Sequence, residues 1–159
     1  MPNWCTNKLY VAGPKEDLDR FFEGIQESED GELSIMKSYL PMPEELHGTK
    51  SPGDEPNWYD WQLENWGCKW GDCDLSFEDQ SEDYLIIEYD TPWGPCNQGI
   101  LGVAKLFPTL FFEVEYYEEG MNFRGRFVCE EGMVVEDESW EMTDDDLEDL
   151  GLKDEDWDE

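Results

Sequence analysis

The residues of this sequence that most clearly offer chemistry are its carboxylates. The 159 residues include 42 Asp and Glu against 10 Lys and Arg, which gives a formal net charge of −32. Residues 136–159 hold 14 acids and one lysine, a local net of −13, and the other 135 residues hold 28 acids and 9 bases, a net of −19. Direct contact with nucleic acid or with an anionic membrane is disfavoured, because both need lysine and arginine. Halophilic adaptation is also disfavoured, because it spreads acids over the whole surface.

Acidic runs in regular structure can hold carboxylates at separations comparable to those of phosphates. B-DNA carries one negative charge per ~1.7 Å of axis, while a helix rises ~1.5 Å and a strand ~3.3 Å per residue. We therefore expect a rigid acidic surface that mimics DNA or RNA in the basic groove of a partner protein. The alternative is a solvated acidic face with a solubilising tail. The residues expected on the mimic surface are Glu113, Glu115, Glu118, Glu119, Asp144, Asp145, Asp146, Glu148 and Asp149.

Zinc-binding and catalytic patterns are weak. Cys68 and Cys73 lie five residues apart without a second pair, and His47 is the only histidine, whereas a zinc site needs four ligands. A Cys–His nucleophile would require His47 beside a cysteine, and His47 falls in an irregular segment. Paired carboxylates occur throughout so acidic a chain and carry no information, and there is no Gly-rich phosphate loop or nucleophile elbow. We expect no metal, no cofactor and no enzymatic activity.

The acidic C-terminal segment partly matches a calcium-binding loop. Asp144, Asp146, Glu148 and Glu155 stand at the first, third, fifth and twelfth positions of an EF-hand loop. The sixth position requires glycine for the turn, and here it is Asp149. Chance matches are expected among so many acids, so we do not expect a specific calcium site.

The stretch "WYDWQLENWGCKW" at residues 58–70 concentrates four of the eight tryptophans. A platform that stacks on bases needs nearby cations, and Lys69 is the only one within the stretch. Packing against the core is the favoured interpretation, and a protein-binding patch is the alternative, because tryptophan often anchors interfaces. The aromatic cluster expected here comprises Trp58, Trp61, Trp66 and Trp93.

The five cysteines (Cys5, Cys68, Cys73, Cys96 and Cys129) are odd in number and scattered along the chain. This usage is typical of free thiols in a reducing compartment. The sequence begins without a charged and apolar leader, and it contains no apolar run near 18 residues. We therefore expect a soluble protein of the cytoplasm.

Local patterns predict the elements of the first half of the chain. The alternating "TNKLYVAG" at residues 6–13 predicts a strand. A helix is predicted over residues 14–25, because Leu18, Phe21, Phe22 and Ile25 form one apolar stripe. Four prolines make residues 30–70 an irregular insert, with a short helix that Asn57 begins and Gly67 ends.

The second half of the chain is predicted to form two hairpins separated by a helix. Strands are predicted over residues 73–79 and 84–90, and a helix over 98–107. The runs at 109–117 and 122–130 predict a hairpin around Glu119 and Gly120. A two-residue loop there would place Glu115 opposite Arg124 and Glu113 opposite Arg126. Residues 132–137 are expected to add an edge strand.

The order of these elements is that of a split β-α-β plan. It predicts an α+β, ferredoxin-like domain with an antiparallel sheet and two helices on one face. We place this domain at residues 1–136, with the Trp- and Pro-rich insert at about 30–70. Residues 137–159 form an acidic C-terminal tail in which Thr143 can cap a short helix.

Four motifs also connect the chain to a known family. They are "MPNWCTNKLYVAGP" at the N-terminus, "LPMPEEL" at residues 40–46, "WYDWQLENWGCKW" at 58–70 and "YDTPWGP" at 89–95. Residues 1–132 thereby resemble the YubB-type ferredoxin-like family of phage, plasmid and genomic-island proteins. The resemblance implies the ferredoxin-like fold and an origin on a mobile element, and it supplies no catalytic residue.

Charge and resemblance together favour an inhibitor of a host nucleic-acid-binding protein in a bacterial cell. The partner would be a restriction enzyme, a CRISPR effector or a recombination nuclease, which makes this an anti-restriction or anti-CRISPR type of function. Trp140 or Trp157 would anchor the contact. One alternative is a scaffold module that binds through the aromatic cluster while the acids only solubilise. A third hypothesis is an enzyme that uses the same cluster as a pocket.

Overall fold

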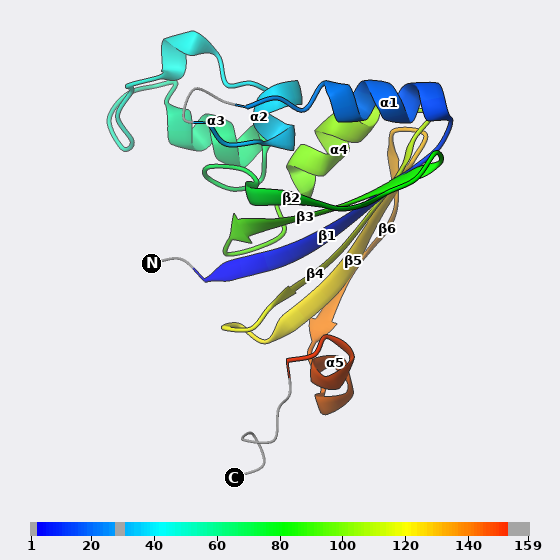
Figure 1. The fold of residues 1–159 in the computed structure, drawn as a ribbon. Helices are drawn as coiled ribbons and strands as arrows, with labels where there is room; N and C mark the ends of the chain where they lie inside the picture. The colour runs from blue at the N-terminus through cyan, green and yellow to red at the C-terminus, as the bar shows by residue number, and fades with distance from the viewer. Residues whose placement is uncertain (1–2, 28–30, 153–159) are drawn as a thin grey trace.

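Six antiparallel strands form one sheet with the order β2-β3-β1-β4-β5-β6 (Figure 1). The computed structural model describes residues 3–27 and 31–152. The elements are β1 (Trp4–Ala12), α1 (Lys15–Glu23), α2 (Ile35–Tyr39), the 3-10 helix η1 (Glu44–Leu46), α3 (Trp58–Asn65), β2 (Cys73–Gln80), β3 (Tyr84–Pro92), α4 (Asn97–Leu106), β4 (Phe111–Glu118), β5 (Phe123–Glu130), β6 (Met133–Glu141) and α5 (Asp144–Asp149).

The predicted α+β class and ferredoxin-like plan are confirmed. Figure 1 shows α1, α2 and α4 above one face of the sheet, whereas α5 lies at the far end of β6. The other face of the sheet, which we call the open face, carries no helix over its centre. In the described part of the chain, no helix has the length and apolarity needed to cross a membrane.

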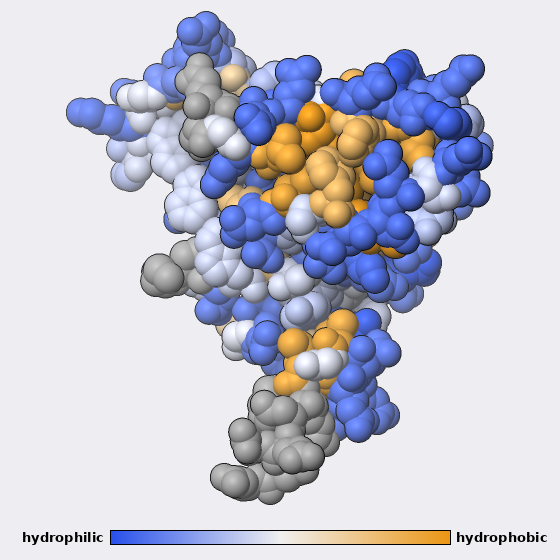
Figure 2. Space-filling model, viewed as in Figure 1, coloured by the Kyte–Doolittle hydropathy of each residue, from blue (hydrophilic) through white to orange (hydrophobic). Residues whose placement is uncertain are grey.

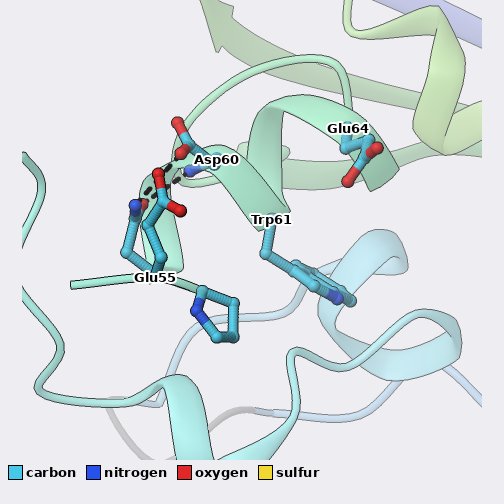
Figure 3. Close-up of a pocket in the computed structure, with 6 residues that line it drawn as sticks. Glu55, Asp60, Trp61 and Glu64 are labelled. Atoms are coloured by element: carbon cyan, nitrogen blue, oxygen red, sulfur yellow. Dashed lines mark hydrogen bonds between the residues drawn. The ribbon is translucent and has the colours of Figure 1, made fainter.

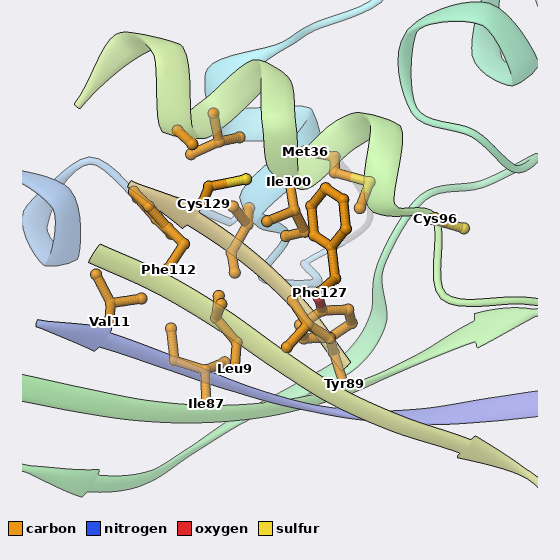
Figure 4. Close-up of a cluster of buried hydrophobic side chains, with 14 of the residues drawn as sticks. Leu9, Val11, Met36, Ile87, Tyr89, Cys96, Ile100, Phe112, Phe127 and Cys129 are labelled. Carbon is orange, nitrogen blue, oxygen red and sulfur yellow. The ribbon is translucent and has the colours of Figure 1, made fainter. Parts of the chain in front are cut away.

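The core lies between the sheet and the helices because alternate strand residues point the same way. Leu9 and Val11 of β1, Ile87 of β3 and Phe112 of β4 are all buried on the helix-covered face. They pack below Ile100 of α4 (Figure 4). The surface around this core is mostly hydrophilic, with one apolar area between the helical layer and the sheet and a smaller one near α5 (Figure 2).

A buried carboxylate ties the irregular segment to the sheet. Asp72, just before β2, is 2% exposed. It accepts hydrogen bonds from Ser34 Oγ (2.7 Å), Ile35 N (2.7 Å) and Met36 N (3.0 Å) at the start of α2. Burial raises the pKa of Asp72, and those donors oppose the rise. Further along the segment, the predicted cap of α3 is present, because the Asn57 side chain accepts from Asp60 N at 2.9 Å.

The predicted register of the β4–β5 hairpin is wrong by two residues. Glu115 lies opposite Arg126, and Tyr117 lies opposite Arg124. The loop spans residues 119–122 instead of two residues. Its geometry is set by the Glu118 carboxylate, which accepts hydrogen bonds from Gly120 N (2.8 Å) and Met121 N (2.6 Å).

Two of the five cysteines are bonded to each other, so the prediction of five free thiols is also wrong. Cys68 and Cys96 form a disulfide with their Cα atoms 5.4 Å apart, a separation typical of such bonds. They are 28 positions apart in the sequence, so only the fold brings them together. Cys5, Cys73 and Cys129 are free.

Candidate partner-binding surface

One of the nine acids predicted to lie on the binding surface is buried instead. Glu118 is 1% exposed and faces the helix-covered side of β4, where it holds the β4–β5 loop. It cannot contact a partner, and its assignment to the mimic surface is corrected. The signal was the alternation of β4, because Glu118 follows Phe112, Val114 and Tyr116 on the buried face of the strand.

The acids of β4 lie on the open face and are partly balanced by cations. Glu113 Oε2 is 2.9 Å from Arg126 Nη2, and Arg126 Nη1 is 2.5 Å from Glu136 Oε2 of β6. These two carboxylates raise the pKa of the Arg126 guanidinium. Glu115 is exposed and lies opposite Lys8 in the β1–β4 register. At the centre of the open face, acidic side chains therefore alternate with Lys8 and Arg126, and they do not form a continuous row of negative charge.

The acids of α5 are held in place by the end of the sheet. Arg124 Nη1 of β5 lies 3.0 Å from Asp146 Oδ1 and 3.2 Å from Asp149 Oδ2. Trp140 of β6 donates its indole N–H to Asp146 Oδ2 at 3.3 Å. Thr143 begins the helix with a capping box, in which its side chain accepts from Asp146 N and its own N–H donates to the Asp146 carboxylate.

These contacts make Asp146 a structural residue of α5. The hydrogen bond from the Thr143 N–H contributes most to lowering the pKa of Asp146, followed by the Thr143 hydroxyl, Arg124 and Trp140. Asp144 and Asp145 in the first turn, and Glu148 beyond it, remain exposed. Thus α5 has a fixed side that faces the sheet and an acidic side that faces solvent.

The predicted site residues do not include the acids of β6, although an edge strand is predicted over residues 132–137. This strand is the edge of the sheet, and all of its residues except Glu136 are exposed, on both faces. Asp137 and Glu138 follow Glu136 directly, and Glu141 ends the strand. The signal was present as four acids in six residues after Val134 and Val135. The strand continues to Glu141, beyond the predicted end at residue 137, because a strand exposed on both faces lacks the hydrophobic alternation that marks its bounds.

Together β6 and α5 form one continuous surface that we call the acidic strip. Residues 133–152 contain nine acids and no lysine or arginine. Within the described residues, three of the nine (Glu136, Asp146 and Asp149) take part in ion pairs with Arg124 or Arg126. The six exposed carboxylates that define the strip are Asp137, Glu138, Glu141, Asp144, Asp145 and Glu148.

The spacing of the strip follows from its backbone. Successive side chains of a strand point to opposite faces, so carboxylates on one face of β6 lie about 6.6 Å apart along the strand, about twice the ~3.4 Å rise between phosphates along one strand of B-DNA. The hydrogen bonds and ion pairs of Arg124 and Arg126 hold the backbone beneath the strip. The strip is thus a supported region of negative charge on β6 and α5, and α5 lies at the end of the sheet away from the main helical layer (Figure 1).

The four tryptophans of the predicted aromatic cluster have different environments. Trp66 is buried and donates its indole N–H to Leu40 O at 2.8 Å, and Trp61 packs edge-on against it at 5.4 Å between ring centroids. Trp58 is half-buried, with its ring against Tyr59. Trp93 is 54% exposed and lines a separate hollow of about 320 Å³. The sequence did not reveal the stacking of Trp4 on Trp70 beside this region, at 6.3 Å.

A larger hollow of about 540 Å³ lies beside α3. Figure 3 shows the Trp61 ring at its wall, with the carboxylates of Glu55, Asp60 and Glu64 around it. The Asn57 amide donates to Asp60 Oδ2 at 3.0 Å. Its lining contains no serine, cysteine, histidine or lysine, and its titratable groups are the three carboxylates.

Two predicted residues lie outside the described part of the chain. They are Glu155, from the comparison with a calcium loop, and Trp157, from the proposed anchors. Trp140, the other proposed anchor, is 41% exposed on β6 within the acidic strip. Over residues 3–27 and 31–152, no group of three or more His, Cys, Asp or Glu side chains is placed to hold a metal ion.

Comparisons with known proteins support the fold. A family model described as "Ferredoxin-like domain in Api92-like protein" matches residues 72–158. The uncharacterized protein YubB of Escherichia coli strain K12 is 29% identical over 83 residues, 51% of this chain and 57% of YubB, so the match spans little more than half of that relative. The crystal structure of protein Api92 from Yersinia pseudotuberculosis aligns with a TM-score of 0.67 at 9% identity, over 90% of this chain and 99% of that one.

Proposed function

Since the chain belongs to the family of ferredoxin-like domains in Api92-like proteins, we propose that it is a non-enzymatic binding protein that mimics a polynucleotide. Its acidic strip occupies the basic surface of a nucleic-acid-handling protein in a bacterial cytoplasm and keeps DNA or RNA out. The partner is a host defence protein, which makes this an anti-restriction or anti-CRISPR function of a mobile element. In this proposal the Trp- and Pro-rich insert at about residues 30–70 packs on the domain. The acidic segment predicted as a tail at 137–159 supplies part of the binding surface, and its residues 137–141 belong to the sheet as the second half of β6.

One observation carries the proposal. Six exposed carboxylates lie on β6 and α5, in a segment (residues 133–152) that contains no lysine or arginine. The cations beneath them, Arg124 and Arg126, bond to other acids and thereby fix the backbone of the strip. A solubilising tail would need neither the capping box at Thr143 nor the ion pairs of Arg124.

The physical consequence is fast and salt-dependent binding. A dense field of one sign steers an oppositely charged partner and raises the association rate, and added salt screens it. A groove that binds phosphates through lysine and arginine offers the complementary charge. The strip would therefore compete with DNA for the same groove without any contact to bases.

The first experiment compares two variants of equal charge. In the strip variant, the six carboxylates of the acidic strip are replaced by the corresponding amides. In the control variant, six exposed acids outside the acidic strip are replaced by amides in the same way. These are Glu16, Glu23, Glu44, Glu45, Glu64 and Glu82. Each protein is immobilised, exposed to a bacterial lysate at low salt and eluted with duplex DNA. We expect the wild type and the control variant to release the same nucleic-acid-binding protein, and the strip variant to release none. Equal loss in both variants would contradict a localised surface.

A second candidate function rests on two exposed tryptophans with an unusual backbone. Trp70 and Trp93 have φ angles of 71° and 70°, a region that bulky residues rarely adopt, and they are 38% and 54% exposed. Strain of this kind is often kept for function. In a scaffold module, these rings would contact the partner.

Replacement of Trp93 by glycine tests this second candidate. Glycine accepts a positive φ without strain, so we expect the thermal midpoint of Trp93→Gly to be unchanged or higher. The scaffold function predicts that this variant loses its partner, whereas the acidic-strip function predicts that it keeps it. The lysate capture described above measures both outcomes.

A further inference from the structure

Among residues 3–27 and 31–152, none pairs with the outer edge of β6, which presents a row of backbone donors and acceptors. β6 is the last strand in the sheet order, with β5 as its neighbour on one side. Just after it, Met142 N donates to Asn122 O at 2.9 Å and so points toward the β5 side. Because hydrogen-bonding direction alternates along an antiparallel strand, the N–H and C=O groups of Asp137, Ser139 and Glu141 point to the free edge.

The side chains of β6 change character along this edge. Met133, Val134 and Val135 at its start are 66%, 41% and 54% exposed, although they are apolar. The acids of the strip begin directly after them. Both faces of β6 are open to solvent. The side chains of a strand added at this edge would therefore lie beside those of β6 on both faces of the sheet.

We propose that β6 binds an extended basic segment of a partner protein as a seventh strand of the sheet. The segment carries lysine or arginine opposite the acidic half of β6 and apolar residues opposite Met133, Val134 and Val135. This inference rests on the proposed function and states how the partner reaches the acidic strip. Basic arms of nucleic-acid-binding proteins have the required chemistry, because they are extended and lie along a phosphate backbone.

Charge decides against a second copy of this chain at the same edge. In an antiparallel pair of β6 strands centred on Asp137, each Asp137 would face its copy, and Glu136 would face Glu138. Like charges directly opposite each other destabilise a sheet. A parallel pair in register would place every carboxylate beside its own copy. A basic strand removes this repulsion and replaces it with attraction.

The same acids explain why the edge does not pair with any available strand. Charged side chains on an edge strand are a common protection against indiscriminate pairing. Here all the charges of the exposed half have one sign, so they repel acidic strands and are complementary to basic ones. The protection and the selectivity thus come from one set of side chains.

A proline at Ser139 tests edge pairing without changing charge. Its N–H points to the free edge, so Ser139→Pro removes an outward donor and keeps the pairing with β5. Ser139→Ala is the matched control, since it loses the hydroxyl, which bonds to Tyr116, but keeps the N–H. The probe is the acetylated and amidated peptide Lys-Thr-Lys-Thr-Lys-Val-Thr-Val, titrated calorimetrically at low salt. A version with N-methyl groups on alternate residues has the same charge and cannot form a strand pair.

We expect the peptide to bind the wild type and Ser139→Ala alike, and to bind Ser139→Pro at least about tenfold more weakly. The N-methylated peptide should bind the wild type about as weakly as the unmodified peptide binds Ser139→Pro, and this result does not depend on the folding of any variant. Binding of the unmodified peptide should also slow hydrogen exchange at the amides of Asp137, Ser139 and Glu141. No binding, or equal binding of both peptides, would overturn the edge-pairing inference. The lysate capture tests the proposed function separately. If the strip variant loses its cellular partner and the control variant keeps it, the proposed function stands even without edge pairing. If the strip variant keeps the partner, the proposed function and the edge-pairing inference both fail.

Discussion

Arg124 of β5 and Asp146 of α5 lie 3.0 Å apart, from Nη1 to Oδ1, and their ion pair joins the acidic helix to the end of the sheet. Both side chains are largely covered, with 15% and 17% of their surface exposed. The guanidinium also lies 5.8 Å from the ring centroid of Trp140. The position of α5 therefore depends on one cation within a strongly acidic region.

Replacing Arg124 distinguishes the effect of a fixed geometry on partner binding from the effect of net charge. Arg124→Gln makes the protein more negative, so a mechanism based on charge alone predicts tighter binding. The supported strip predicts the opposite, because α5 is released and its carboxylates lose their fixed positions. We expect partner binding to weaken by about fivefold, the effect of losing a surface contact that orders a segment. Titration of the captured partner measures it, and tighter binding would contradict the role given to Arg124.

Acid should release α5 at a low and defined pH. The pKa of Asp146 is lowered in the folded protein, chiefly by the Thr143 N–H. A group with a lowered folded pKa stabilises the fold above its unfolded pKa of about 3.9, and this contribution disappears as the pH falls through the folded value. We expect Trp140 fluorescence to change below about pH 4 and not between pH 5 and 8.

Two variants identify the fluorescence change as the release of α5. Trp140→Phe should remove the signal, because the reporting indole is absent. In Asp146→Asn the amide does not titrate, so the change should be absent over the same range. An identical transition in Asp146→Asn would show that another group causes it.

The attachment of β6 to the sheet depends on a glycine. A Cβ atom at Gly125 of β5 would lie 2.3 Å from the Tyr116 hydroxyl and 2.5 Å from Glu138 O of β6. We therefore expect Gly125→Ala to lower the free energy of unfolding by about 1–3 kcal/mol, as overpacking usually does. Gly94→Ala is the control, because a Cβ there meets nothing within 4 Å. Chemical denaturation of both variants tests this, and equal stabilities would contradict the close approach at Gly125.

The buried carboxylate of Asp72 should matter for stability. In Asp72→Asn, the amide keeps one acceptor and places a donor among the N–H groups of Ile35 and Met36. We expect a loss of about 1–3 kcal/mol in the free energy of unfolding. Asp74→Asn, two residues further at an exposed position, should change it by less than about 0.5 kcal/mol. Equal effects at the two positions would show that Asp72 does not anchor α2.

The sequence predicted those parts of the fold that local patterns determine. The apolar stripe that includes Leu18 and Phe21 predicted α1, and Asn57 predicted the start of α3. The order of strands and helices was sufficient for the split β-α-β plan. These features depend on residues a few positions apart, so one sequence contains their signal.

The features that the sequence did not predict depend on residues that meet only in the fold. The β4–β5 register follows from a carboxylate, Glu118, that turns inward within an acidic run. The bond between Cys68 and Cys96 joins two loops. The edge strand was predicted to end at residue 137, whereas β6 continues to Glu141. Arg124 was assigned to Glu115, although its partners are on α5. The candidate site was therefore located only in part from the sequence.

The most direct test of the central claim is competition for labelled DNA. The protein eluted from the immobilised chain is incubated with a fluorescent duplex, and the chain is added while polarisation is recorded. We predict that the wild type and the control variant displace the duplex, that salt weakens the displacement, and that the strip variant leaves the duplex bound. Displacement by the strip variant as effective as that by the wild type would contradict the claim that the carboxylates of β6 and α5 take the place of a polynucleotide.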